Sequence, residues 1–253
     1  MTDPHKRGPL LDQLERLCIA HPIAPKYVFV PRVQLGRAIE DALGRGQESW
    51  AGLRCLIPRH YAERLAEPDV QASGRAEVPV GGKSILAARV MEDAADHDAL
   101  KDLPRSPSFA SAIGRAIETL RLGGVGPEAA WERAGRPEAA DSLRAVARCY
   151  DGYLSLLEGE ALYDDADVFR WATERVRAGT APEVSQAVFA VCNGTELPER
   201  AYQFLRALRE QGRAFYRIGA PSGNRAPAQS AKTLFPGAGP PPPSREADAG
   251  SGR

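Results

Sequence analysis

The stretch "VGGKS" at residues 80–84 has the ending of a loop that binds the phosphates of ATP. The full pattern also needs a glycine five residues before Gly82, where this sequence has Glu77. A carboxylate at that position would repel phosphate, and the following Val78 and Pro79 do not supply a nest of backbone N–H groups. We therefore interpret the stretch as a turn that opens a helix, and we expect no phosphate-loop ATP site and no cofactor.

Three carboxylates lie close together in "LYDDADVFRW", at Asp164, Asp165 and Asp167. Carboxylate oxygens are ligands for divalent metals. The same residues also stand at the start of a predicted helix, where acidic side chains cap free amides and offset the helix dipole. We favour capping and predict no metal site. The four histidines are scattered, and no G-x-S-x-G or Ser-His-Asp arrangement indicates a hydrolase.

Basic side chains follow two predicted strands, "YVFV" and "LRCLIP". Arg32 and Arg37 come after the first, with Gln34 between them, and Arg59 comes after the second. Because the carboxyl ends of parallel strands face the usual ligand crevice, Arg32 and Arg59 would both lie there. Contact with a phosphate backbone is one interpretation. The other interpretation, solvated surface arginines, is equally compatible with the sequence.

These side chains must be positioned by strands that alternate with helices at both ends of the chain. The predicted strands are 27–30, 53–58, 186–192 and 213–219. Such alternation is typical of an α/β fold, with a parallel sheet and helices on both faces. From residue 83 to 179 the apolar spacing is helical. The sequence therefore predicts an α/β domain built from 1–80 and 180–221, with a large all-helical insertion at 81–179.

The end of the chain has a different composition. Residues 222–253 are rich in Pro, Gly, Ala and Ser, and four prolines run from 240 to 243. Such a segment cannot bury enough apolar surface to offset its ordering entropy, so we predict a disordered tail.

Charge and cysteine pattern limit the class of protein. The 253 residues include 33 Lys and Arg and 33 Asp and Glu, and this balance argues against a binder that attracts nucleic acid through bulk charge.

The four cysteines form no C-x-x-C pair, which favours buried thiols in a reducing compartment. The N-terminal segment is interrupted by Asp and Glu, so it is neither a signal peptide nor a membrane span. We expect a cytoplasmic protein with no membrane partner.

Five segments, in their order and spacing, resemble the N-terminal part of the AddB/RexB-type subunit of bacterial helicase–nucleases, which is grouped with PD-(D/E)XK nuclease superfamily proteins. They are "YVFVPRVQLGRAIEDAL", "SWAGLRCLIPRHYAERLAEP", "SFASAIGRAIETLRLGGVGPEAA", "AVARCYDGYLSLLEGEALYDDADVFRWA" and "QAVFAVCNGTELPERAYQFLRAL". The resemblance spans most of residues 9–220. It implies a RecA-like domain of the superfamily 1 helicase type that carries a helical insertion.

The resemblance also assigns roles to residues. It makes Arg32 and Gln34 candidates for contact with single-stranded DNA. The strand that carries a metal-binding Asp-Glu pair in active helicases matches "FAVCNGTELPER", where Cys192 and Asn193 stand instead. A thiol and an amide cannot do the work of two carboxylates on Mg²⁺. Because the phosphate loop is also missing, the resemblance implies an inactive ATPase.

The function implied is a non-catalytic, helicase-like scaffold in DNA double-strand-break processing and recombinational repair. Its expected partners are DNA, bound weakly and without sequence preference, and a helicase or nuclease subunit. The family's nuclease domain would lie beyond Arg253, so no nuclease motif can be carried over. Two alternatives stay open: an ATP-dependent helicase or PD-(D/E)XK nuclease subunit with an unrecognised site, and a plain protein-interaction module.

Overall fold

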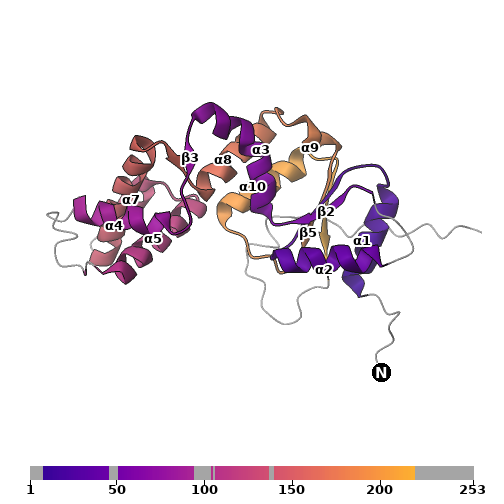
Figure 1. Cartoon of the computed structure of the whole chain (residues 1–253), viewed down its shortest axis with the longest axis horizontal. Coiled ribbons are helices and arrows are strands. Elements are labelled where there is room, and N and C mark those ends of the chain that lie inside the picture. Colours follow the sequence, from indigo (N-terminus) through magenta and orange to yellow (C-terminus); the bar gives the residue numbers. More distant parts are fainter. Residues whose placement is uncertain (1–7, 46–50, 94–103, 105, 137–139, 220–253) are drawn as a thin grey trace, which may run out of the picture. The chain divides into compact units, whose positions relative to one another are not determined.

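The computed structural model describes residues 8–45, 51–93, 104, 106–136 and 140–219 (Figure 1). The chain divides into two compact units, which we describe separately. Unit 1 comprises 1–61, 174–197 and 205–253, and unit 2 comprises 62–173 and 198–204. The predicted tail at 222–253 lies outside the described residues. Among the helices that the structure describes, none has the length and apolar character that crossing a membrane requires.

Unit 1 is built on a four-stranded parallel sheet with the strand order β2-β1-β5-β6. Its strands are β1 (Lys26–Phe29), β2 (Leu53–Leu56), β5 (Val188–Cys192) and β6 (Ala214–Ile218). The two central strands, β1 and β5, are buried along their whole length, as their apolar sequences predict. The predicted α/β class with a parallel sheet is therefore confirmed.

One face of this sheet packs against helices α1 (Pro9–Ala20) and α2 (Val33–Gly44). The core here joins apolar stripes of both helices to alternate strand residues, among them Leu14, Leu17, Ile39, Leu43, Val28, Val188 and Ala190. Gly36 lets α2 approach the sheet, because a Cβ at this position would lie 3.0 Å from the Cβ of Cys55. This close approach holds α2 against the sheet.

The other face carries a cluster of aromatic rings. Tyr27, Phe29 and Phe189 point to this face because side chains alternate along a strand, and Tyr61 from the first turn of α3 (Pro58–Ser73) packs with them. The rings of Phe29 and Phe189 are nearly parallel, with centroids 6.1 Å apart. Gly212 follows α10 (Glu199–Gln211), and a Cβ there would lie 2.7 Å from the Phe189 ring.

A buried lysine lies at the amino end of the sheet. Lys26 is 1% exposed, and its ammonium donates hydrogen bonds to the carbonyl oxygens of His21 at 2.6 Å and Ala24 at 2.8 Å, with Pro22 at 3.5 Å. Burial lowers the pKa of Lys26, and the nearby Cys18 offsets this only in part. The ammonium thus holds together the turn between α1 and β1, at the edge opposite to the predicted ligand crevice.

We expect Lys26→Met to destabilise the protein by about 1–3 kcal/mol, because the buried carbonyls lose their donor while the cost of burying the charge is relieved. Urea unfolding checks this. The loss should grow at high pH. Because the pKa of Lys26 is lowered, the unfolded chain binds more protons than the native one just below pH 10.5, so the wild type gains stability as pH rises through that window and the Met variant does not. A variant more stable than the wild type at pH 7 would contradict the role of the ammonium.

Unit 2 is mainly helical. Its helices are most of α3, α4 (Gly82–Asp93), α5 (Pro107–Leu122), α6 (Pro127–Ala134), α7 (Asp141–Gly159), most of α8 (Asp165–Arg177) and the first part of α10. The core gathers Val90, Ile113, Ile117, Tyr150 and Tyr153. The predicted start of α5 is confirmed, because Ser106 Oγ accepts a hydrogen bond from the Phe109 amide and Pro107 is the first helical residue.

The prediction of an all-helical segment at 81–179 is wrong in one place. The two-residue strands β3 (Ala76–Glu77) and β4 (Leu162–Tyr163) pair in parallel within unit 2. Two residues are too short to produce a recognisable alternation of apolar and polar side chains, and their pairing joins segments far apart in the sequence. The short helix α9 (Pro182–Gln186) of unit 1 was likewise not predicted.

Candidate functional site

The carboxyl edge of the sheet in unit 1 carries the residues predicted to contact DNA. Phe29 of β1 and Leu56 of β2 are register partners, and Arg32 and Arg59 each follow one of them by three residues. The structure therefore places both arginines at one edge, as the sequence predicts. Arg32, Gln34 and Arg37 are exposed, whereas Arg59 is half-buried. Whether these side chains contact DNA stays a prediction.

The strand order reverses direction at this edge. From β1 the chain continues to β2 on one side, and it later returns to β5 on the other side. Open α/β sheets bind ligands at such a reversal, outside the carboxyl ends of the two strands. Arg32 follows β1 there, and Asn193 follows β5.

Helix α2 begins at this reversal with a positive end that is not neutralised by its own sequence. Arg32 is its N-cap residue, the Arg32 side chain makes no capping hydrogen bond, and no acidic residue lies in the first turn. The helix dipole and the Arg32 guanidinium therefore both favour an anion at this position. Further along, Glu40 is turned to the edge strand β2, where its carboxylate accepts a hydrogen bond of 2.8 Å from the Cys55 amide.

Cys192 and Asn193, at the end of β5, are both engaged in the fold. Cys192 is 5% exposed, and burial raises the pKa of its thiol to about 11, so it stays protonated at neutral pH. The Asn193 side chain donates a 2.8 Å hydrogen bond to the Gly219 carbonyl, which ties the end of β5 to the end of β6. A neutral buried thiol is a poor ligand for Mg²⁺, which takes oxygen ligands.

Lys83, the lysine of "VGGKS", belongs to unit 2 and forms ion pairs there. Its ammonium lies 2.5 Å from a carboxylate oxygen of Glu118 and 3.0 Å from one of Asp165, so it joins the starts of α4 and α8 to α5. Gly82 and Lys83 are the first residues of α4. The prediction that this stretch is a turn opening a helix is confirmed.

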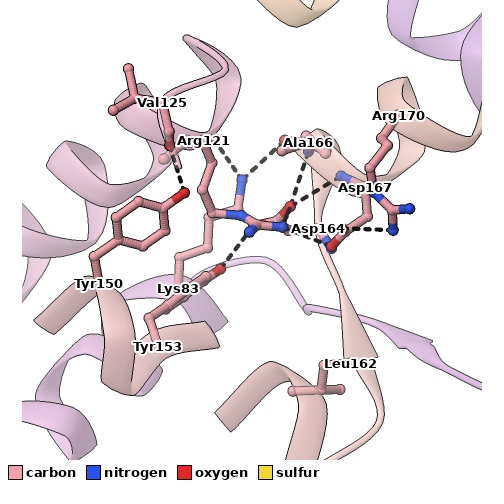
Figure 2. Close-up of polar contacts among 12 residues, drawn as sticks. Lys83, Arg121, Val125, Tyr150, Tyr153, Leu162, Asp164, Ala166, Asp167 and Arg170 are labelled. Carbon is pink, nitrogen blue, oxygen red and sulfur yellow. Dashed lines mark hydrogen bonds and ion pairs between the residues drawn. The ribbon is translucent and has the colours of Figure 1, made fainter. Parts of the chain in front are cut away.

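Two carboxylates of the acidic cluster, Asp164 and Asp167, bind the largely buried Arg121, which the sequence did not reveal (Figure 2). Arg121 donates to both carboxylate oxygens of Asp164, at 2.6 and 2.9 Å, and to Asp167 at 2.8 Å. The Tyr153 hydroxyl adds a hydrogen bond of 3.2 Å to Asp164. Burial by itself lowers the pKa of Arg121, but the hydrogen bonds and charge of Asp164 outweigh it and raise that pKa. The cluster is a buried, fully engaged ion-pair network.

The same carboxylates also cap α8, as the sequence predicts. Asp164 Oδ1 accepts from the amides of Ala166 at 3.0 Å and Asp167 at 3.4 Å, and Asp167 in turn accepts from the Asp164 amide at 3.3 Å. This reciprocal pattern is that of a capping box. Within the part of the chain that the structure describes, no group of three or more His, Cys, Asp or Glu side chains is arranged to hold a metal ion.

The sequence matches no protein-family model, and no curated protein is significantly similar to it.

Proposed function

We propose that the chain is a non-catalytic, RecA-like scaffold that contacts single-stranded DNA at the carboxyl edge of its sheet. It would work in DNA double-strand-break processing beside a helicase or nuclease partner subunit. The observation that carries the proposal is the positive start of α2 at the strand reversal, where Arg32, Gln34 and Arg37 are exposed and Arg59 lies at the same edge. The nearby positions that would need carboxylates for ATP hydrolysis hold Cys192 and Asn193.

Binding at this edge should be weak and independent of base sequence. The net charge of the chain is zero, so little long-range attraction assists association. With only one or two phosphates neutralised, the logarithm of the affinity should fall with the logarithm of salt concentration at a slope of about −1 to −2. Contacts with the DNA backbone position a protein without reading sequence.

We expect the double variant Arg32→Ala/Arg59→Ala to bind a labelled single-stranded oligonucleotide about tenfold more weakly than the wild type, since two phosphate contacts are lost. For this variant, the slope of the logarithm of the affinity against the logarithm of salt concentration should be shallower by about one to two. Fluorescence anisotropy at two salt concentrations measures both. Arg45→Ala is the matched control, because Arg45 is exposed at the opposite end of the same helix.

If the double variant and Arg45→Ala bind as tightly as the wild type, the carboxyl edge does not contact DNA. If the wild type fails to bind even beside a helicase or nuclease subunit, the chain is better described as a protein-interaction module.

A further inference from the structure

Unit 2 contains a hollow of about 410 Å³ that the proposed function does not use. Its lining comes from the end of α3, the residue before β3, and helices α5, α7 and α8. The charged residues in the lining are Arg75, Arg121, Arg170, Glu158 and Asp167, and the remainder are Ser73, Leu154, Leu157 and Trp171. The volume is in the range of small-ligand sites.

One wall of the hollow is fixed. Arg121 has a side chain that is 9% exposed and is held by Asp164 and Asp167, which are themselves engaged in the cap of α8. Such a network leaves its members little freedom to change partner. Arg121 is therefore a rigid part of the wall, and its charge is already balanced by Asp164 and Asp167.

The other two arginine side chains are more exposed than that of Arg121. Arg75, whose side chain is 25% exposed, forms an ion pair with Glu158, whose side chain is 74% exposed, and it also donates a hydrogen bond of 3.5 Å to the Leu162 carbonyl. The Arg170 side chain is 40% exposed, lies 3.4 Å from Asp167, and has its guanidinium 5.3 Å from the centre of the Trp171 ring. Exposed ion pairs contribute little stability, so a phosphate can replace the Glu158 carboxylate at low cost. The planar guanidinium fork suits phosphate in particular.

The hollow also offers apolar surface. Leu154 of α7 and Trp171 line it beside the arginines, whereas Leu157, which is 3% exposed, contributes little accessible surface. Aromatic and aliphatic surface next to guanidinium groups is the combination on which single-stranded nucleic acid binds, with bases stacked and phosphates paired.

We propose that this hollow binds one nucleotide unit of a single strand, with its phosphate on Arg75 and Arg170 and its base against Trp171. The contact lies in unit 2 and goes beyond the proposed contact at the sheet edge in unit 1. The lining has three guanidiniums and two carboxylates, and Asp164, which pairs with Arg121, adds a third carboxylate. The charges of these groups therefore cancel before the ligand binds. The phosphate must therefore displace Glu158, and removing the charge of Glu158 must strengthen binding.

The test is fluorescence anisotropy with a labelled oligothymidine of about 12 nucleotides, within the usual site size of single-strand binders. We expect Arg170→Ala to weaken binding about fivefold, because one positive charge that contacts the phosphate is lost. We expect Glu158→Gln to strengthen binding about threefold, because the exposed negative charge that the phosphate must displace is lost. Arg144→Ala is the matched control, because Arg144 is also 40% exposed and also pairs with an aspartate three residues away, Asp141. It should bind like the wild type, and circular dichroism should show all variants folded.

Tryptophan fluorescence gives a second readout. The oligonucleotide should quench wild-type emission, and Trp171→Phe should lose that quenching although it keeps the other two tryptophans of the chain. If Arg170→Ala, Glu158→Gln and Trp171→Phe all behave like the wild type, the hollow is not a nucleic-acid contact.

Two further comparisons test the hollow separately from the sheet edge, and test whether its ligand is a single strand or a free nucleotide. Loss of binding in Arg32→Ala/Arg59→Ala but not in Arg170→Ala would leave the sheet edge as the DNA contact and overturn the assignment of the hollow. The reverse result would support the hollow and overturn the sheet edge, and no binding by the wild type would overturn both. If free thymidine monophosphate competes as well as the oligonucleotide at equal nucleotide concentration, the hollow takes a free nucleotide and the single-strand assignment is wrong.

Discussion

Asp164→Ala should destabilise the protein by about 3–5 kcal/mol, because it removes one partner of a buried ion pair and leaves Arg121 only partly compensated. Asp164 is 5% exposed, and it binds both Arg121 nitrogens that face it. Its loss also leaves the amides of Ala166 and Asp167 without their cap. Urea unfolding gives the magnitude, and amide hydrogen exchange should show the earliest loss of protection in α5 and at the start of α8.

Asp164→Asn separates the two roles of this side chain. An asparagine oxygen still caps the helix, so Asp164→Asn should be about 1 kcal/mol more stable than Asp164→Ala. It should remain less stable than the wild type, because the charge of Arg121 is still only partly compensated. Asp141→Ala is the control: its carboxylate is 90% exposed and pairs with Arg144 in the same unit, so it should change stability by less than about 1 kcal/mol. Equal stability of Asp164→Ala and Asp141→Ala would show that the buried network does not hold unit 2 together.

Phe189→Ala should cost about 3–5 kcal/mol in unit 1, since it leaves a cavity in the aromatic cluster of the central strand. The Phe189 side chain is 0% exposed, and its ring contacts those of Tyr27, Phe29 and Tyr61. Three partners surround the ring, so the site cannot collapse without moving both central strands. The same unfolding measurement gives the loss, and hydrogen exchange should locate it in β1 and β5.

The register partner of Phe189 on the next strand supplies the control. Phe215 of β6 is only half-buried, so Phe215→Ala removes less surface from the core and should cost about 1–2 kcal/mol. If both substitutions cost the same, burial at the centre of the sheet would not determine the stability of unit 1.

The proposed DNA contacts do not depend on these core residues. Arg32 is exposed at the start of α2 and Arg170 is partly exposed on α8, so alanine at these two positions should leave the packed cores unchanged. Arg59 is half-buried, so the double variant Arg32→Ala/Arg59→Ala needs circular dichroism to show that it is folded. Loss of binding in a folded variant therefore reports on the contact itself.

The sequence by itself determined much of the local structure. The apolar stripe of residues 9–20 and the cap at Ser106–Pro107 identified α1 and α5, because these signals lie within a few residues of the helix that they specify. The buried run at 188–192 identified β5 in the same way. The capping role of Asp164 was also predictable, since an N-cap bonds to amides two or three residues away.

Only the tertiary structure decided which distant residues meet. Nothing near Asp164 in the sequence indicates Arg121, 43 residues away, and nothing near Lys26 predicts that carbonyls of the preceding turn would enclose its ammonium. The order β2-β1-β5-β6 and the pairing of β3 with β4 likewise join segments separated by whole helices. Local spacing specifies which face of an element is apolar, whereas pairing depends on the packing of all elements at once. The hollow with Arg75, Arg170 and Trp171 therefore emerges only in the folded chain.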